Sequence, residues 1–201
     1  MSSLLDILSA PIVRNVMSVR SESSGPYAVA FRAYEHVKFV AVLRGSFYLW
    51  VEGETKATTL RPGDCYMLTN GADYRVFNAD VPETDAATFY ATNRKIDGVV
   101  RWGAGRVDTV TIGCRATFNP QMADWLRDRL PPFIRIPGGT AAAVRFCSIL
   151  TLLCGDPERA PGAAFVADRF VGILLAEVLR HVFAAGGVRR PQWFTDFATD
   201  I

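Results

Sequence analysis

Residues 63–78, which read GDCYMLTNGADYRVFN, carry the clearest indication of the fold in this sequence. Gly63 and Gly71 punctuate the stretch, and the side chains around them favour strands: Tyr66, Met67, Leu68, Tyr74, Val76 and Phe77. Glycine permits the backbone conformations of tight turns, whereas aromatic and β-branched residues pack well in sheets. The stretch therefore predicts a strand, a tight turn and a second strand.

A β-hairpin is predicted immediately upstream. Residues 38–51 read KFVAVLRGSFYLWV, two β-rich runs broken at residues 44–46. Both faces of each run are largely apolar, as expected where one face lines a barrel and the other packs against a second layer. Period-two alternation or β-rich composition predicts further strands at residues 12–20, 27–34, 87–92 and 107–117.

Helical patterns dominate after residue 118. Asn119 followed by Pro120 is typical of an N-cap and a first helical position. Residues 140–153 are apolar except for a thin polar line, and residues 164–183 keep a polar arc of about 120°. Two such helices expose more apolar surface than one contact inside the chain is expected to bury. A short amphipathic helix is also predicted at residues 2–10.

The composition is that of a globular protein. Half of the 201 residues are apolar, 21% are charged and the net charge is +2. Because 22 basic residues are interspersed with 20 acidic ones, the chain lacks the basic stripe of a compact DNA-binding domain. The length suits one domain of ordinary size, or one domain with a helical appendage.

The cysteines and the N-terminus indicate a cytoplasmic protein. Cys65, Cys114, Cys147 and Cys154 lie far apart without a CxxC pair, so we expect buried free thiols. The opening MSSLLDILSA has no basic segment typical of a signal peptide. No apolar run reaches the ~18 residues that span a bilayer, so we expect no membrane association.

The spacing of the first stretch resembles the second sequence motif of the cupin β-barrels. It reads Gly63, five residues, Thr69, one residue, Gly71, two residues, Tyr74, three residues and Asn78. Gly45 suits the glycine that ends the first cupin motif. The resemblance implies an α+β protein: a cupin-type antiparallel β-barrel, or double-stranded β-helix, followed by a C-terminal helical segment.

The order of segments resembles the N-terminal sensor domains of AraC-type bacterial transcription regulators. Six stretches carry this resemblance in sequence order: SLLDILSA, KFVAVLRGSFYLW, LRPGDCYMLTNGADYRV, TIGCRATFN, LRDRLPPFIRI and APGAAFVADRFVGILLAEVLRHVF. It implies a barrel with a short N-terminal helix over residues 1–118 and dimerisation helices over residues 119–187. It also implies a linker over residues 188–201 toward an absent DNA-binding half, so that DNA is contacted only through that half.

Four positions depart from the metal-binding pattern that the resemblance implies. Lys38 stands where the first motif has its glutamate, Val40 and Tyr74 replace histidines, and Thr69 replaces a proline. Only His36 lies near these positions, and one imidazole does not make a cluster that binds a transition metal. We therefore expect a barrel without a metal or other cofactor.

An unidentified small-molecule effector is the partner that the resemblance implies for the barrel interior. Candidate lining residues are Lys38, Val40, Val42, Tyr74 and Val76, with Tyr48, Trp50 and Tyr66 as weaker candidates. The same aromatic side chains could instead fill a solid barrel, because small barrels are often packed shut.

The helix over residues 164–183 is the candidate dimer interface. Its apolar positions Leu174, Leu175, Val178 and Leu179 are the predicted contacts of a homodimer, although a core within one chain explains them equally well. Two functions besides effector sensing stay open. One is a metal-free, isomerase-like enzyme that uses Tyr74 and Lys38 as acid and base, and the other is a dimerisation module without a ligand.

Overall fold

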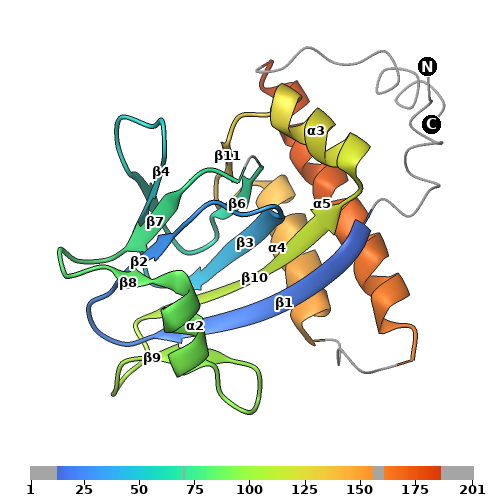
Figure 1. Cartoon of the computed structure of the whole chain (residues 1–201). Helices are drawn as coiled ribbons and strands as arrows, with labels where there is room; N and C mark the ends of the chain where they lie inside the picture. Colours follow the sequence, from blue (N-terminus) through green and yellow to red (C-terminus); the bar gives the residue numbers. More distant parts are fainter. Residues whose placement is uncertain (1–12, 70, 156–160, 187–201) are drawn as a thin grey trace.

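Two curved β-sheets and a layer of helices make up the computed structural model, which describes residues 13–69, 71–155 and 161–186 (Figure 1). One sheet has the order β11 (Phe133–Ile136), β6 (Cys65–Leu68), β3 (Val37–Arg44), β10 (Thr109–Phe118), β1 (Val13–Ser23) and β9 (Val100–Trp102). The other has the order β5 (Thr58–Leu60), β4 (Phe47–Val51), β7 (Tyr74–Phe77), β2 (Ala28–Phe31) and β8 (Thr84–Asp85). Pairing is antiparallel except for β1 with β9 and β2 with β8.

The two strands predicted within residues 63–78 are confirmed as β6 and β7, which belong to different sheets, while residue 70 of the predicted turn lies outside the described residues. Gly71 has a φ of 73°, and a Cβ there would overlap the backbone of Tyr34. The Asn78 side chain accepts the Tyr27 N–H at 2.8 Å and donates to the Gly25 carbonyl at 3.0 Å. These contacts hold the segment before β2 against the end of β7.

Strand β3 separates two hydrophobic clusters because its side chains alternate between two faces. Val37, Phe39 and Ala41 join the cluster under the helices, whereas Val42 joins the cluster between the two sheets. Each face of β3 therefore packs against one of the two hydrophobic clusters. The sheet is a shared wall between a helix-covered core and a barrel interior.

Residues 87–92 are helical, so the strand predicted there is wrong. They belong to α2 (Ala86–Asn93), which lies beside the barrel. The Asp85 carboxylate accepts the backbone N–H groups of Ala87 at 2.9 Å and Thr88 at 3.2 Å. This N-cap satisfies the first turn of the helix and outweighs the β-rich composition of the segment.

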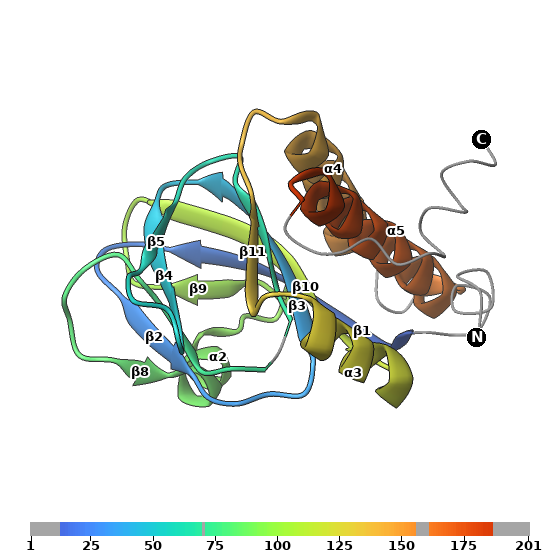
Figure 2. The ribbon, with the colours of Figure 1, turned by 90° about the horizontal axis from the view of Figure 1, so that it is seen from above.

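The predicted helices after residue 118 are confirmed as α3 (Pro120–Arg129), α4 (Ala141–Gly155) and α5 (Ala163–Ala184). Figure 2 shows α4 and α5 side by side on one face of the six-stranded sheet. Between α3 and α4 the chain forms β11, which pairs with β6, so residues 119–187 are not a purely helical segment. The buried carboxylate of Glu177 on α5 accepts a bond from Arg145 of α4 at 2.9 Å.

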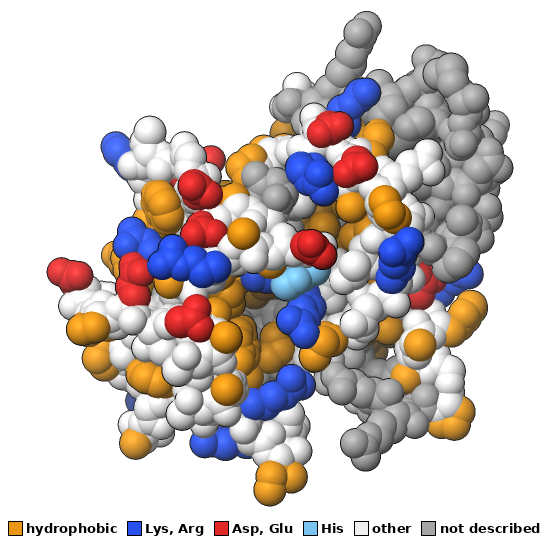
Figure 3. Space-filling view, in the orientation of Figure 1, with side chains coloured by type: hydrophobic (Ala, Val, Ile, Leu, Met, Phe, Trp, Pro, Cys, Tyr) orange, Lys and Arg blue, Asp and Glu red, His pale blue; other side chains and the backbone are white. Residues whose placement is uncertain are grey.

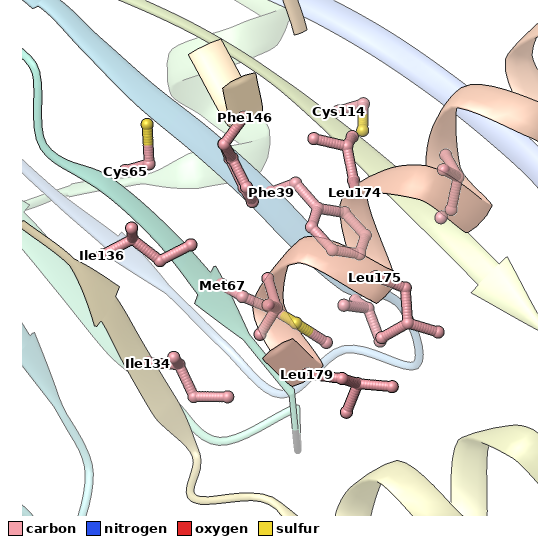
Figure 4. Close-up of a cluster of buried hydrophobic side chains, with 14 of the residues drawn as sticks. Phe39, Cys65, Met67, Cys114, Ile134, Ile136, Phe146, Leu174, Leu175 and Leu179 are labelled. Carbon is pink, nitrogen blue, oxygen red and sulfur yellow. The ribbon is translucent and has the colours of Figure 1, made fainter. Parts of the chain in front are cut away.

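The four residues predicted as dimer contacts lie inside the monomer. Leu174, Leu175, Val178 and Leu179 are buried in the cluster between the helices and the sheet. Figure 4 shows Leu174, Leu175 and Leu179 in one cluster with Met67 and Phe39. This placement corrects the prediction, because α5 directs these leucines at its own sheet. The large apolar side chains exposed on the two helices are Val144, Leu152, Phe165, Val166 and Ile173.

The helix predicted at residues 2–10 and the linker predicted at residues 188–201 lie outside the described residues. No described helix combines the length and the apolar character that a crossing of a lipid bilayer requires.

Candidate functional site

A cavity of about 510 Å³ lies between the two sheets. Strands β1, β2, β3, β7 and β10 and helix α2 contribute its lining. In Figure 3 the surface is hollowed near the centre of the view, where basic side chains and a histidine gather. The barrel is therefore not packed shut, and the interpretation that aromatic side chains fill it completely is not supported.

Cross-strand pairing of β3 with β10 builds the wall of the cavity. Lys38 lies opposite Arg115, and Val40 lies opposite Gly113. All four residues line the cavity, as expected because directly paired residues share one face of a sheet. Since Gly113 has no side chain, the position next to Val40 adds no bulk to the interior.

An aromatic cage surrounds the ammonium group of Lys38. Its Nζ donates a hydrogen bond to the Tyr74 hydroxyl at 2.7 Å. The same Nζ lies 3.8 Å from the ring centroid of Tyr34, 4.3 Å from that of Tyr74 and 4.7 Å from that of Phe31. Phe31 stacks on Tyr74 with centroids 4.3 Å apart, which holds two of the rings in place. Aromatic faces attract a cation at these distances.

Burial and like charge lower the basicity of two groups in the cavity. Burial, reinforced by the nearby charge of Arg115, lowers the pKa of Lys38 to about 7. Burial, together with the charges of Lys38 and Arg115, lowers the pKa of His36 to about 4. Near neutral pH the imidazole is therefore uncharged, whereas Lys38 is poised between its two protonation states.

The phenol groups that line the cavity stay protonated near neutral pH. Burial raises the pKa of Tyr27 to about 12 and raises the pKa values of Tyr34, Tyr66, Tyr74 and Tyr90 above their ordinary value. A neutral phenol can donate or accept a hydrogen bond. The cavity thus combines apolar walls with a few polar groups.

Five of the eight predicted lining residues border the cavity: Lys38, Val40, Tyr66, Tyr74 and Val76. Val42 is buried in the same interior cluster but does not line the cavity. Tyr48 and Trp50 lie on the outer face of the barrel, so their prediction was wrong. Tyr48 is 43% exposed and stacks on Phe77, and the Trp50 Nε1–H donates to the Glu54 carbonyl at 3.0 Å.

Sequence reasoning missed several lining residues. Phe31 and Tyr34 belong to the alternating run of residues 27–34, so their alternation could have marked them as candidates. Phe89 and Tyr90 were missed because α2 was interpreted as a strand. Arg115 lies directly opposite Lys38, but one sequence does not specify the register between distant strands.

The side chains at the positions of cupin metal ligands do not suit a transition metal. Lys38 and Tyr74, which occupy two of these positions in the sequence, do meet in space, and the hydrogen bond between them is 2.7 Å long. In its ammonium form Lys38 offers no lone pair and adds positive charge at the place where a cation would bind. Within the described residues, no three His, Cys, Asp or Glu side chains gather into a metal-binding group.

The comparisons with known proteins agree with this architecture. A cupin family model matches residues 3–184. The chain belongs to the cupin family. It is also 32% identical over 182 residues to a protein of Streptomyces antibioticus and 34% identical over 184 residues to one of Streptomyces lividans. Both carry the name "Putative AraC-like transcription regulator".

The matched region of this cupin chain is only part of those relatives. It covers 90% of the chain but 59% of the length of each curated relative. Among solved structures, an apo form of ToxT from Vibrio cholerae aligns with 84% of the chain and 57% of its own length, at 9% identity and a TM-score of 0.47. The AraC-like activator CuxR aligns with 79% of the chain and 45% of its own length, at 12% identity and a TM-score of 0.44.

Proposed function

We propose that this chain is the effector-sensing and dimerisation part of an AraC-like transcription regulator and that a small molecule binds in the barrel cavity without a metal. The strongest support for binding of a small molecule is the cavity of about 510 Å³. Binding sites for small molecules are typically about 300–1,000 Å³ in volume and mostly apolar, with a few placed polar groups. In this proposal the protein acts in the cytoplasm, and DNA contacts belong to a separate DNA-binding half.

A thermal-shift screen with a metabolite library tests the sensing role. A molecule that binds only the folded protein raises its melting temperature as its concentration exceeds its Kd. Val40→Phe would fill part of the cavity and should abolish the shift, whereas Ile96→Phe, at a fully exposed side chain away from the cavity and from α4 and α5, is the control. If the same molecules raise the melting temperatures of both variants equally, they do not bind in the barrel, and this part of the proposal is contradicted.

The proposed dimer uses the outer face of α4 and α5. Val144 and Leu152 on α4 and Phe165, Val166 and Ile173 on α5 are at least 37% exposed. Large apolar side chains grouped on adjacent helices are typical of an association surface. A symmetric pair would bury the same surface on both subunits. Light scattering at tens of micromolar should give twice the mass of one chain.

One observation keeps an enzymatic role as the second candidate. The Lys38 Nζ and the Tyr74 hydroxyl are 2.7 Å apart, and burial together with the Arg115 charge lowers the pKa of Lys38 to about 7. An amine with such a pKa is suited to general-base catalysis near neutral pH. A metal-free isomerase would convert a cavity ligand into an isomer of the same mass, so NMR spectra of ligands after incubation separate the two functions. A dimer that binds no small molecule would support the third possibility, a dimerisation module.

A further inference from the structure

We propose that the cavity selects an organic anion, a molecule with an apolar or aromatic body and one acidic head group, and that Lys38 and Arg115 hold this head group. The inference rests on the proposed function, because it names the chemical class of the molecule that the cavity would sense.

The sheet register places two positive charges side by side. Lys38 of β3 and Arg115 of β10 are direct cross-strand partners, and both line the cavity. The Cβ atoms of such partners lie about 4.5–5.5 Å apart, and like charges in these positions destabilise a sheet. The lowered pKa of Lys38 is in part the effect of the Arg115 charge. A bound anion would relieve this repulsion.

Neither charge has a counter-ion among the described residues. Lys38 donates to the neutral Tyr74 hydroxyl, and the Arg115 Nη2 lies 2.6 Å from the thioether sulfur of Met17. Arg115 is an exposed residue at the edge of the cavity, where a ligand can reach it. A phenol and a thioether accept hydrogen bonds but do not neutralise a cation.

The other charged residues that line the cavity do not neutralise Lys38 and Arg115. Arg94 also lines it and forms no ion pair with a described carboxylate, and Arg32 is paired with Asp73 at 3.1 Å. Asp85 is the one carboxylate among the described lining residues, and its Oδ2 accepts the N–H groups at the start of α2. The cavity therefore has an excess of positive charge.

The remaining walls suit an apolar or aromatic body. Phe31, Phe47, Val76 and Phe89 line the cavity with apolar side chains. Aromatic side chains favour stacked or edge-to-face contacts with other rings. A molecule with one charged end would thus place that end at Lys38 and Arg115 and its body among these side chains.

Binding of the anion should be coupled to protonation of Lys38. The titratable groups around it are His36 and Tyr34 before β3, Tyr74 on β7, Tyr66 on β6 and Tyr90 on α2. Near neutral pH the phenols and His36 are uncharged, since their pKa values are shifted away from this range. Because an anion favours the ammonium form, complex formation near pH 7 should take up protons, which calorimetry in two buffers of different ionisation enthalpy measures.

A matched pair of fluorescent probes tests the selection. 8-Anilinonaphthalene-1-sulfonate is an aromatic anion, and N-phenyl-1-naphthylamine has the same rings without the acid group. The wild-type protein should bind the sulfonate at least about tenfold more tightly, since one favourable charge contact of about 1.4 kcal/mol corresponds to that ratio. Lys38→Gln and Arg115→Gln should each reduce the preference, whereas Lys56→Gln, which removes a charge outside the cavity, should leave it unchanged.

The outcomes separate this inference from the proposed function. If both probes bind equally, and Val40→Phe weakens both, the cavity binds small molecules but does not select anions, and the inference is wrong. If neither probe binds, or if Val40→Phe changes neither affinity, the cavity does not select aromatic anions and the inference is wrong, whereas the thermal-shift screen with Val40→Phe decides the proposed function separately. A sulfonate preference that survives in both glutamine variants would also overturn the inference.

Discussion

The Lys38 Nζ donates a hydrogen bond of 2.7 Å to the Tyr74 hydroxyl, and this bond connects the two sheets of the barrel. Lys38 belongs to β3 of the six-stranded sheet, and Tyr74 belongs to β7 of the five-stranded sheet. A charged donor paired with a neutral acceptor in a half-buried site makes the stability of the barrel sensitive to pH.

Lys38→Met should stabilise the protein most at low pH. The folded-state pKa of Lys38 is lowered from its ordinary value of 10.5 to about 7. Below the folded pKa both states are protonated, and the folded protein carries the full penalty of a buried charge. Between the two pKa values the unfolded chain binds more protons, so the wild-type free energy of unfolding rises with pH.

The advantage of Lys38→Met should therefore narrow from neutral pH toward pH 10. Urea denaturation at several pH values measures it, and Lys56→Met serves as an exposed control whose effect should not change in this way. A constant difference between Lys38→Met and wild type across the range would show that the lysine charge is not penalised in the folded state.

Tyr74→Phe should lower the free energy of unfolding by about 1 kcal/mol, because it removes the hydroxyl that accepts the Lys38 bond while keeping the ring. Tyr48→Phe is the matched control, since Tyr48 is 43% exposed on the outer face of the barrel. Chemical denaturation should show little change for the control. Equal effects of the two variants would argue against a specific contribution from the Lys38 contact.

Leu175→Glu should unfold or aggregate the protein, because Leu175 is only 3% exposed within the core under the helices. Burial of an unpaired carboxylate is strongly unfavourable. Phe165→Glu, at a side chain that is 64% exposed, should instead keep the native circular dichroism spectrum and produce monomers. A folded, monomeric Leu175→Glu variant would restore the original prediction for this residue.

Elemental analysis of the purified protein should find no stoichiometric iron, zinc, nickel or manganese. The reason is the donor set, since Lys38, Val40 and Tyr74 replace ligands that a transition metal needs. One metal ion per chain that is retained through dialysis and lost in Tyr74→Phe would contradict this prediction.

Residues 1–201 should not bind DNA sequence-specifically at physiological salt. Their net charge is +2, with 22 basic and 20 acidic residues, and an evenly mixed surface gives little attraction to phosphates. Gel shifts with upstream DNA of the encoding gene and with an unrelated duplex of equal length measure this. A sub-micromolar affinity confined to the upstream DNA would contradict it.

The barrel could be predicted because its signals are local. The spacing from Gly63 to Asn78 indicated strands β6 and β7. The resemblance of two separate motifs, one ending at Gly45 and one containing Tyr74, placed Lys38 and Tyr74 at one site, where they form a hydrogen bond. Alternation within β3 correctly predicted that Lys38 and Val40 face the cavity. Such patterns depend on the backbone geometry of a strand and not on distant partners.

The errors arose where the answer depends on contacts that one sequence does not specify. The hairpin predicted over residues 38–51 is wrong, because β3 and β4 lie in different sheets and do not pair. In β4 the inward residues are Phe47, Leu49 and Val51, so Tyr48 and Trp50 face outward. In α5, apolar residues cover most of the circumference, so the pattern did not indicate which side meets the sheet.

Because β3 is a shared wall, the cavity and the helix layer are mechanically linked by a single strand. Lys38 and Val40 border the cavity, whereas Phe39, one residue away on the opposite face, lies 6.1 Å from the ring of Phe146 on α4. A bound molecule that displaces the β3 backbone also displaces Phe39 against α4, since close-packed side chains do not absorb such movements. Sensing and association would then need no lever or hinge between them, and a signal would cross the thickness of one sheet.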